Sequence, residues 1–296
     1  MLDSEELAKL RKAGTVSAAA RDKGMAMVKA GAKLYDVAQE VEGYIRSRGC
    51  GLAFPCNLGI NEVAAHYTPS VNDKKVFEVG DVVKVDCGAE LDGYVGDTAG
   101  TVEVGTRTYK DLVAASKTAR DTVAEFVCAG VQICEIGRTV DMCIRQAGFD
   151  PIRNLCGHQI KPYNLHAGLS IPNYDDGDAS KVESGMVIAI EPFATNGVGR
   201  VDNGPLGNIV RIVRERPLAD AKALEFLNYA KEEFHTFPFC ARSCDFKDAE
   251  KHVKTLIRHG VLSAYAQMVE SSGGMVSQHE HTFYITEGKA EVTTLS

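Results

Sequence analysis

Two aspartates, Asp86 and Asp97, are spaced so that their side chains could bind metal ions together. Residues 82–91 form a β-branched run that leads into Asp92-Gly93, a dipeptide typical of a two-residue hairpin turn, and residues 94–104 return as the partner strand. In this register Asp86 and Asp97 are diagonal neighbours on one face, with Cβ atoms roughly 7 Å apart or less. Carboxylates that close can share metal ions roughly 3.5–4 Å apart.

The same register places Gly88 opposite Asp97, which we expect to keep that position of the hairpin open. Two like charges at such a distance destabilise a sheet unless a cation lies between them. The alternative interpretation is a pair of solvated carboxylates on an exposed hairpin. Other side chains in the sequence favour the metal site.

Three further motifs offer metal ligands. The motif Gly157-His158-Gln159-Ile160 provides the His158 imidazole, Glu191 closes a β-branched run, and a predicted final strand at residues 279–286 carries Glu280 between two histidines. With the two aspartates these residues make four carboxylates and one imidazole. Such a mostly oxygen-donor set suits a pair of Mn, Fe, Co or Zn ions better than a thiolate-rich structural zinc site.

Two other histidines have no place in a set of five ligands. His66 lies in the apparent loop Ala64-Ala65-His66-Tyr67-Thr68-Pro69, and His166 lies in Asn164-Leu165-His166-Ala167-Gly168. A lone histidine is more often a surface or hydrogen-bonded core residue than a functional one. Neither motif alone therefore indicates a role.

The chain repeats itself, and the repeat predicts the elements that position these residues. Residues 30–49 match residues 129–148, a shift of 99 residues, and each copy ends at a glycine, a typical helix stop. The apolar residues of both copies follow the spacing of an amphipathic helix. They are Leu34, Val37, Val41 and Ile45 in the first copy, and Ile133, Ile136, Val140 and Ile144 in the second.

A second match joins residues 80–86 to residues 185–191, a shift of 105 residues. Both stretches are β-branched runs opened by glycine and closed by a carboxylate, Asp86 in one and Glu191 in the other. We therefore expect these residues to end equivalent strands in two halves related by approximate two-fold symmetry. A carboxylate at the same place in both halves indicates a site, because neither carboxylate stabilises a core strand.

The predicted halves are about residues 1–107 and 108–296 of one domain. Helices rich in Ala, Lys, Glu and Met are expected at about 5–28 and 109–128, before each repeated helix. Residues 204–270, without a counterpart in the first half, are interpreted as a helical insertion. Its two charged amphipathic helices are expected at residues 218–235 and 248–259.

Composition excludes several classes of protein. Hydrophobic residues make up 45% of the 296 residues, and no apolar run approaches the roughly 18 residues of a membrane span. Lys plus Arg number 33 against 40 Asp plus Glu, which argues against a nucleic-acid partner. The charged N-terminus predicts no signal peptide. Nine cysteines without a Cys-x-x-Cys pair predict free thiols in a reducing, cytoplasmic compartment.

In its motifs the chain resembles methionine aminopeptidases, in particular the type 2 branch of archaea and eukaryotes. The resemblance runs essentially from end to end, and the helical insertion before Glu280 is what separates type 2 from type 1. Its most specific motifs are Gly51-Leu52-Ala53-Phe54-Pro55, Asn61-Glu62-Val63-Ala64-Ala65-His66-Tyr67-Thr68-Pro69, Val85-Asp86-Cys87-Gly88, Gly157-His158-Gln159-Ile160, Ala189-Ile190-Glu191-Pro192-Phe193 and His279-Glu280-His281-Thr282.

The resemblance implies the pita-bread fold of creatinase- and aminopeptidase-like proteins, an α/β (α+β) architecture. In this fold a pseudo-two-fold curved antiparallel sheet is flanked by helices. The implied activity is hydrolytic removal of the N-terminal methionine from nascent proteins and peptides with a small second residue, through a metal-bridged hydroxide. The implied ligands of two divalent ions (Co, Mn, Fe or Zn) are Asp86, Asp97, His158, Glu191 and Glu280.

The resemblance also implies roles for residues outside the ligand set. His66 and His166 would contact substrate, and Phe54 would form part of the wall that receives the methionine side chain. We expect Glu191 to move a proton besides binding metal, His166 to stabilise the oxyanion, and His66 to hydrogen-bond the scissile amide nitrogen. No pocket residue is assigned in the stretch 197–207.

Two alternatives share the fold. An Xaa-Pro peptidase has the same metal ligands but usually carries an extra N-terminal domain. A metal-free pita-bread binding module would lose ligand residues, whereas this chain has all five. Continuity of the fold, with no coiled-coil seam, favours a monomer. The sequence leaves open the native metal, the tolerance for the second substrate residue, and whether the insertion contacts the ribosome.

Overall fold

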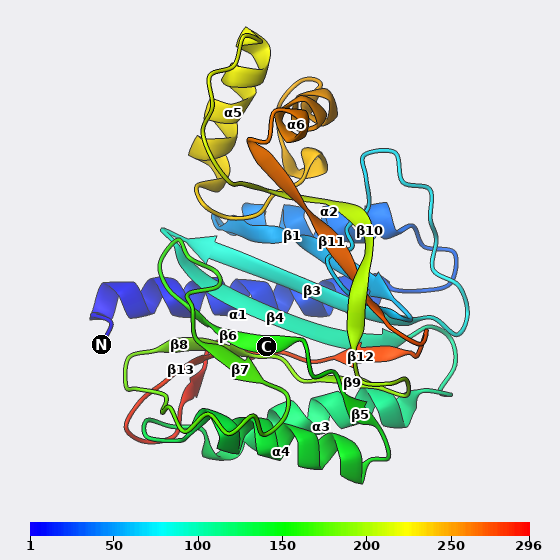
Figure 1. Ribbon diagram of the computed structural model, residues 1–296, viewed down its shortest axis with the longest axis vertical. Helices are drawn as coiled ribbons and strands as arrows, with labels where there is room; N and C mark the ends of the chain where they lie inside the picture. The colour runs from blue at the N-terminus through cyan, green and yellow to red at the C-terminus, as the bar shows by residue number, and fades with distance from the viewer.

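Two pairs of helices lie outside a central set of antiparallel strands in the computed structural model, which describes residues 1–296 (Figure 1). In the first half, strands β1, β3 and β4 form one sheet in that order, and helices α1 and α2 pack against it. The elements of this half are α1 (Ser4–Met27), α2 (Leu34–Ser47), β1 (Gly51–Ile60), β2 (Val63–Ala65), β3 (Val82–Leu91) and β4 (Tyr94–Glu103).

The second half repeats this order of two helices followed by strands. One sheet has the order β14-β13-β8-β6-β7, and a smaller one has the order β12-β9-β5. The elements are α3 (Lys110–Phe126), α4 (Ile133–Gln146), β5 (Asp150–Pro151), β6 (Cys156–Ile160), β7 (Ser170–Pro172), β8 (Val187–Ile190), β9 (Phe193–Thr195), β12 (Val276–Gln278), β13 (His281–Tyr284) and β14 (Glu291–Val292).

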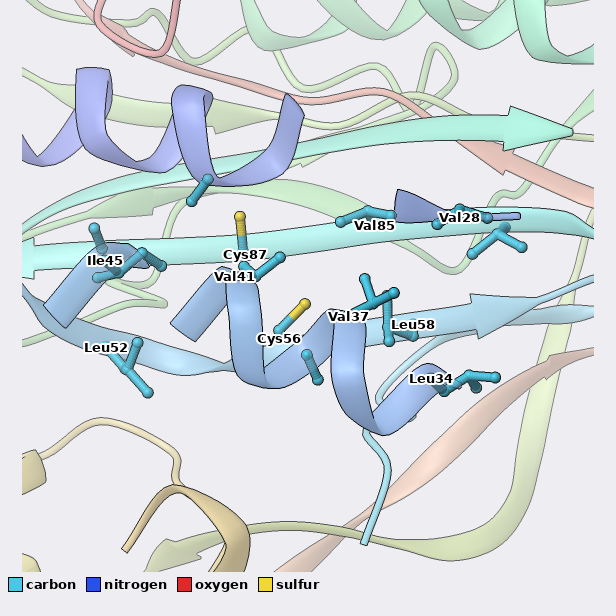
Figure 2. Packing of buried hydrophobic residues seen from close by; sticks show 14 of the residues in the cluster. Val28, Leu34, Val37, Val41, Ile45, Leu52, Cys56, Leu58, Val85 and Cys87 are labelled. Atoms are coloured by element: carbon cyan, nitrogen blue, oxygen red, sulfur yellow. The ribbon is translucent and has the colours of Figure 1, made fainter. Parts of the chain in front are cut away.

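The sequence repeat is visible in the helix bounds, because α4 begins and ends 99 residues after α2 (34 to 133, 47 to 146). Each of these helices buries its predicted apolar stripe completely or almost completely. Figure 2 shows Val37 and Val41 of α2 facing Leu58 of β1 and Val85 of β3. Burial of one such side chain contributes about 1.5–3 kcal/mol, so these stripes fix each helix against its sheet.

One expectation about the repeated strands is wrong. Glu191 directly follows β8, but Asp86 lies in the middle of β3, which continues to Leu91. The difference follows from Pro192, which has no N–H to donate to a sheet ladder and so stops the strand just after Glu191. Asp86 is followed by residues that pair with β4 as far as the turn.

A continuous final strand over residues 279–286 is also wrong. Strand β12 ends at Gln278, β13 begins at His281, and β14 follows later in the chain. The break lies where the chain changes partners, because Gln278 pairs with β9 whereas His281 pairs with β8. At the break, the Glu280 N–H donates to the Ala99 carbonyl of β4 (3.0 Å). Glu280 thus lies at a junction between sheets.

The insertion contains the two expected helices and two strands that the sequence did not predict. Helices α5 (Ala221–Phe234) and α6 (Ala249–Arg258) lie at the top of Figure 1, with a short 3-10 helix η1 (Ala241–Ser243) between them in the chain. The antiparallel strands β10 (Val201–Ile212) and β11 (Leu262–Glu270) connect them to the body, where β11 pairs with β2. No helix combines the length and apolarity needed to cross a membrane, and all nine cysteines are free.

A buried ion pair fastens the insertion to the body. The Arg242 guanidinium of η1 donates to both carboxylate oxygens of Glu42 in α2 (2.6 and 2.9 Å), and the two side chains are only 1% and 5% exposed. Arg242 also donates to the Thr68 hydroxyl and to the Pro69 carbonyl, both in the loop that follows His66. The ion pair therefore joins the insertion, α2 and one edge of the cavity described below.

We expect Arg242→Met to lower the free energy of unfolding by about 3–5 kcal/mol, because the Glu42 carboxylate stays buried without its cation. Urea unfolding at pH 7 measures this change. The double variant Glu42→Gln with Arg242→Met removes both charges and is expected to recover most of the loss. A loss below about 1 kcal/mol in the single variant contradicts the prediction.

Candidate metal centre and substrate pocket

All eight predicted site residues line one cavity of about 250 Å³. They come from β1, β3, β4, β6 and the loops around β2, β6, β8 and β12, so segments from both halves of the chain meet there. The eight residues are Phe54, His66, Asp86, Asp97, His158, His166, Glu191 and Glu280.

The hairpin register that places the two aspartates is confirmed. Asp97 pairs with Gly88, and Asp86 pairs with Ala99, so the two aspartates are diagonal neighbours. The turn residues Asp92 and Gly93 have φ angles of 50° and 85°, the left-handed values that a two-residue hairpin of this kind requires. The turn chemistry therefore sets the position of both carboxylates.

The expectation that Gly88 keeps an open space for the site needs correction. A Cβ atom at Gly88 would lie 2.6 Å from Cε1 of Phe54. The glycine therefore accommodates the Phe54 ring, and the space above it is filled by an aromatic wall of the cavity. The absence of a side chain at Gly88 still matters to the pocket, because any larger residue would displace Phe54.

The tightest group of ligand atoms belongs to Asp97, His158 and Glu280, which each offer one atom within 4.8 Å of the others. The His158 Nε2 atom lies 3.6 Å from Asp97 Oδ2 and 3.9 Å from Glu191 Oε1. Asp86 and Glu191 line the same cavity and are partly exposed. Four carboxylates and an imidazole thus line one cavity.

These residues fit divalent metal ions, as their unpartnered atoms show. One oxygen of each of Asp86, Asp97 and Glu280, and Nδ1 of His158, is buried without a hydrogen-bond partner. Burial raises the pKa of Asp86 to about 7. Burial, followed by repulsion from the neighbouring carboxylates, raises the pKa values of Asp97, Glu191 and Glu280 well above normal. Cations among the oxygens would remove both penalties.

The sequence model of metallopeptidase family M24 matches residues 8–287, nearly the whole chain. The chain belongs to metallopeptidase family M24. Membership in this family means that the chain binds divalent metal, and the buried acidic cluster has the donor atoms for it. The pita-bread fold of the family, two helix-flanked halves around antiparallel strands, is the one observed.

The sequence similarity to relatives within the M24 family extends over the full length of the chain. The chain is 43% identical to the methionine aminopeptidase of Archaeoglobus fulgidus, over 99% of this chain and 100% of the relative. It is 40% identical to that of Methanocaldococcus jannaschii, with the same coverage. The crystal structure of methionine aminopeptidase from Thermotoga maritima superposes with a TM-score of 0.74, covering 100% of this chain and 98% of the other. At 23% identity that structure supports the fold.

His66 and His166, the two predicted site histidines that are not proposed metal ligands, both line the cavity. Burial lowers the pKa of His66, whose Nδ1 lies 3.2 Å from the Ala266 carbonyl. His166 lies beside the ligand cluster, with its ring centroid 4.3 Å from that of His158. Burial, followed by the nearby charges of His66 and Arg211, lowers the pKa of His166. Both imidazoles are therefore neutral at pH 7. His66 donates its one proton from Nδ1 to the Ala266 carbonyl and keeps Nε2 as an acceptor, whereas His166 can donate one hydrogen bond.

Among the cavity residues that sequence reasoning missed are Gln278 and Tyr265. The Gln278 side-chain amide donates to Glu191 Oε2 at 3.3 Å and lies 3.5 Å from Glu280 Oε2. The Tyr265 ring packs edge-on against His66, with centroids 5.1 Å apart. Gln278 precedes Glu280 by two residues, and this proximity to a predicted ligand could have been noticed. Tyr265 carries no such local signal.

The raised pKa of Asp86 predicts how the metal-free protein responds to pH. Between its ordinary pKa near 4 and its folded pKa of about 7, the native state holds a proton that the unfolded state has lost. The Asp86 contribution to stability therefore falls as pH rises through this window. We expect Asp86→Asn to unfold like the parent at pH 4 and to be about 2–4 kcal/mol more stable at pH 8.

This comparison is made by urea unfolding of both proteins after metal removal with a chelator. Mn²⁺ is expected to reverse the order at pH 8, since only the parent keeps the full donor set. Equal stability of the two metal-free proteins at pH 4 and at pH 8 would show that Asp86 does not carry the penalty.

Proposed function

We propose that the chain is a methionine aminopeptidase of type 2 that removes N-terminal methionine from proteins and peptides with a small second residue. The observation that carries the proposal is end-to-end identity of 43% with an archaeal methionine aminopeptidase, and it is supported by a cavity lined by all eight residues predicted for the site. We further propose that it acts as a monomer in the cytoplasm, on nascent chains and with transient contact to the ribosome.

In this proposal two divalent ions (Co, Mn, Fe or Zn) would be held by the five ligand residues. The hard donor atoms and the unpartnered oxygens support this assignment. When bound, such ions lower the pKa of water and polarise a carbonyl oxygen. The proposed ligands are Asp86, Asp97, His158, Glu191 and Glu280.

The remaining cavity residues would bind and orient the peptide. Phe54, together with Leu165 and Pro238, would supply an apolar surface for the methionine side chain. His166 would donate a hydrogen bond to the carbonyl oxygen as negative charge develops on it. His66 would hydrogen-bond the scissile amide nitrogen on the other side of the reacting bond.

Glu191 is proposed to move the proton. Its carboxylate accepts a weak bond from Gln278 and lies 3.9 Å from His158, so it is oriented without being neutralised by a cationic side chain. Burial and the neighbouring aspartates raise its pKa, which favours accepting a proton from the attacking water. The same proton can then pass to the leaving amine.

The test measures free methionine released from Met-Ala-Ser by metal-stripped protein titrated with Mn, Co, Fe or Zn. Activity that depends on added metal, with an Ala-Pro peptide left intact, supports the proposal. Cleavage of the Ala-Pro peptide alone would indicate an Xaa-Pro peptidase. No cleavage of either peptide by folded protein with any metal would overturn the enzymatic proposal in favour of a binding module.

A further inference from the structure

The sequence repeat extends to a pair of buried arginines on the outer helices. Helix α1 contains Ser17, Arg21 and Asp22, and α3 contains Ser116, Arg120 and Asp121, again 99 residues later (17 to 116, 21 to 120). Both arginines are only 7% exposed, and both serines are fully buried. Since arginine is seldom buried without a specific partner, each of these positions requires an explanation.

The two arginines are alike in one contact and differ in another. Each guanidinium donates through Nε and Nη2 to the aspartate that follows it in the helix, at 2.6–2.9 Å. Arg21 also donates from Nη1 to the hydroxyl oxygen of Thr98 at 2.6 Å. Arg120 makes no hydrogen bond beyond Asp121. The two halves therefore differ in this contact, because only Arg21 donates a hydrogen bond to a strand, at Thr98 of β4.

Thr98 connects Arg21 to both sides of the acidic cluster. It directly follows Asp97 in β4, and its hydroxyl donates to the backbone carbonyl of Glu280 at 2.9 Å. Because Arg21 donates to the hydroxyl oxygen, the single hydroxyl proton is directed toward that carbonyl. A continuous chain of hydrogen bonds thus runs from Arg21 through Thr98 to Glu280.

This connection matters because Asp97 and Glu280 belong to different sheets. Strand β4 is the edge of the first sheet, and Glu280 lies in the break between β12 and β13. Besides Thr98, the junction is made by the Glu280 N–H, which donates to the Ala99 carbonyl at 3.0 Å, and by the Thr282 hydroxyl, which bonds both the N–H and the carbonyl of Asp97 at 2.8 Å. The separation of the two carboxylates therefore depends on a few hydrogen bonds, among them those of two oriented hydroxyl groups.

We propose that Arg21 is a positioning residue for the metal centre, holding Asp97 and Glu280 at their spacing through Thr98, whereas its symmetry counterpart Arg120 has no such role. The inference rests on the proposed metal function of these carboxylates. Groups that do not bind the metal but orient its ligands by hydrogen bonds typically contribute 10- to 100-fold to metal affinity.

The experiment compares Arg21→Met with Arg120→Met as a matched control of equal burial and helix position. Mn²⁺ affinity of the metal-stripped proteins is measured by calorimetry, and the visible absorption of Co²⁺ reports the ligand geometry. We expect Arg21→Met to bind Mn²⁺ about 10- to 100-fold more weakly with an altered Co²⁺ spectrum. Arg120→Met is expected to stay within about threefold of the parent protein.

Thr98→Val is close to isosteric and tests the same connection if Arg21→Met does not fold. It is expected to reproduce the loss of affinity, and the double variant is expected to add little to either single change. Parental affinity in Arg21→Met or in Thr98→Val, or an equal loss in Arg120→Met, overturns the positioning role. Absence of Mn²⁺ binding by the parent protein would instead overturn the metal centre itself.

Discussion

Asp97→Asn is expected to lower kcat/KM for methionine release from Met-Ala-Ser by at least about 1,000-fold, since several kcal/mol of transition-state stabilisation depend on intact metal binding. Asp97 supplies one atom of the tightest ligand group, and its free oxygen has no other partner. The asparagine keeps the shape of the side chain and leaves the backbone bonds to Thr282 in place. The loss is therefore attributed to the missing charge, and assays at saturating Mn²⁺ or Co²⁺ measure it.

Asp92→Asn is a matched control for the same hairpin. Asp92 lies at the turn with a side chain 61% exposed, where it pairs with Lys9 and is outside the cavity. Asparagine also tolerates its left-handed backbone conformation. We expect this variant to keep parental kcat/KM. Retention of more than a tenth of parental activity in Asp97→Asn would contradict the proposed role of Asp97.

Local rules explain which parts of the site were predictable from sequence. The positions of Asp86 and Asp97 follow from a two-residue turn, because turn length fixes the register of every later pair in a hairpin. The bounds of α2 and α4 follow from their apolar stripes and terminal glycines. In both cases the deciding information lies within about 20 residues of the chain.

The unpredicted features depend on contacts between distant segments. The break at Glu280 arises because its strand changes from one partner sheet to another, a choice that no local pattern contains. Strands β10 and β11 lie some 50 residues apart in the chain. They were not predicted because the helical pattern of the residues between them led us to interpret the whole segment as helical. The same reason applies to Tyr265, which reaches His66 only through the pairing of β11 with β2. The bond from Arg21 to Thr98 likewise joins a helix to a strand that lies 77 residues later in the chain.

His166→Ala is expected to lower kcat by about 10²–10³-fold while leaving Mn²⁺ affinity and KM nearly unchanged, because an oxyanion donor acts mainly in the transition state. The lowered pKa of His166 makes the imidazole a neutral donor, so the deficit should be the same at pH 7 and pH 8. Steady-state assays with Met-Ala-Ser measure the change, and His259→Ala, at an exposed histidine beyond the end of α6, serves as the control. An unchanged kcat would reject the oxyanion role. Weaker Mn²⁺ binding would instead indicate that His166 acts by supporting His158, whose ring it contacts.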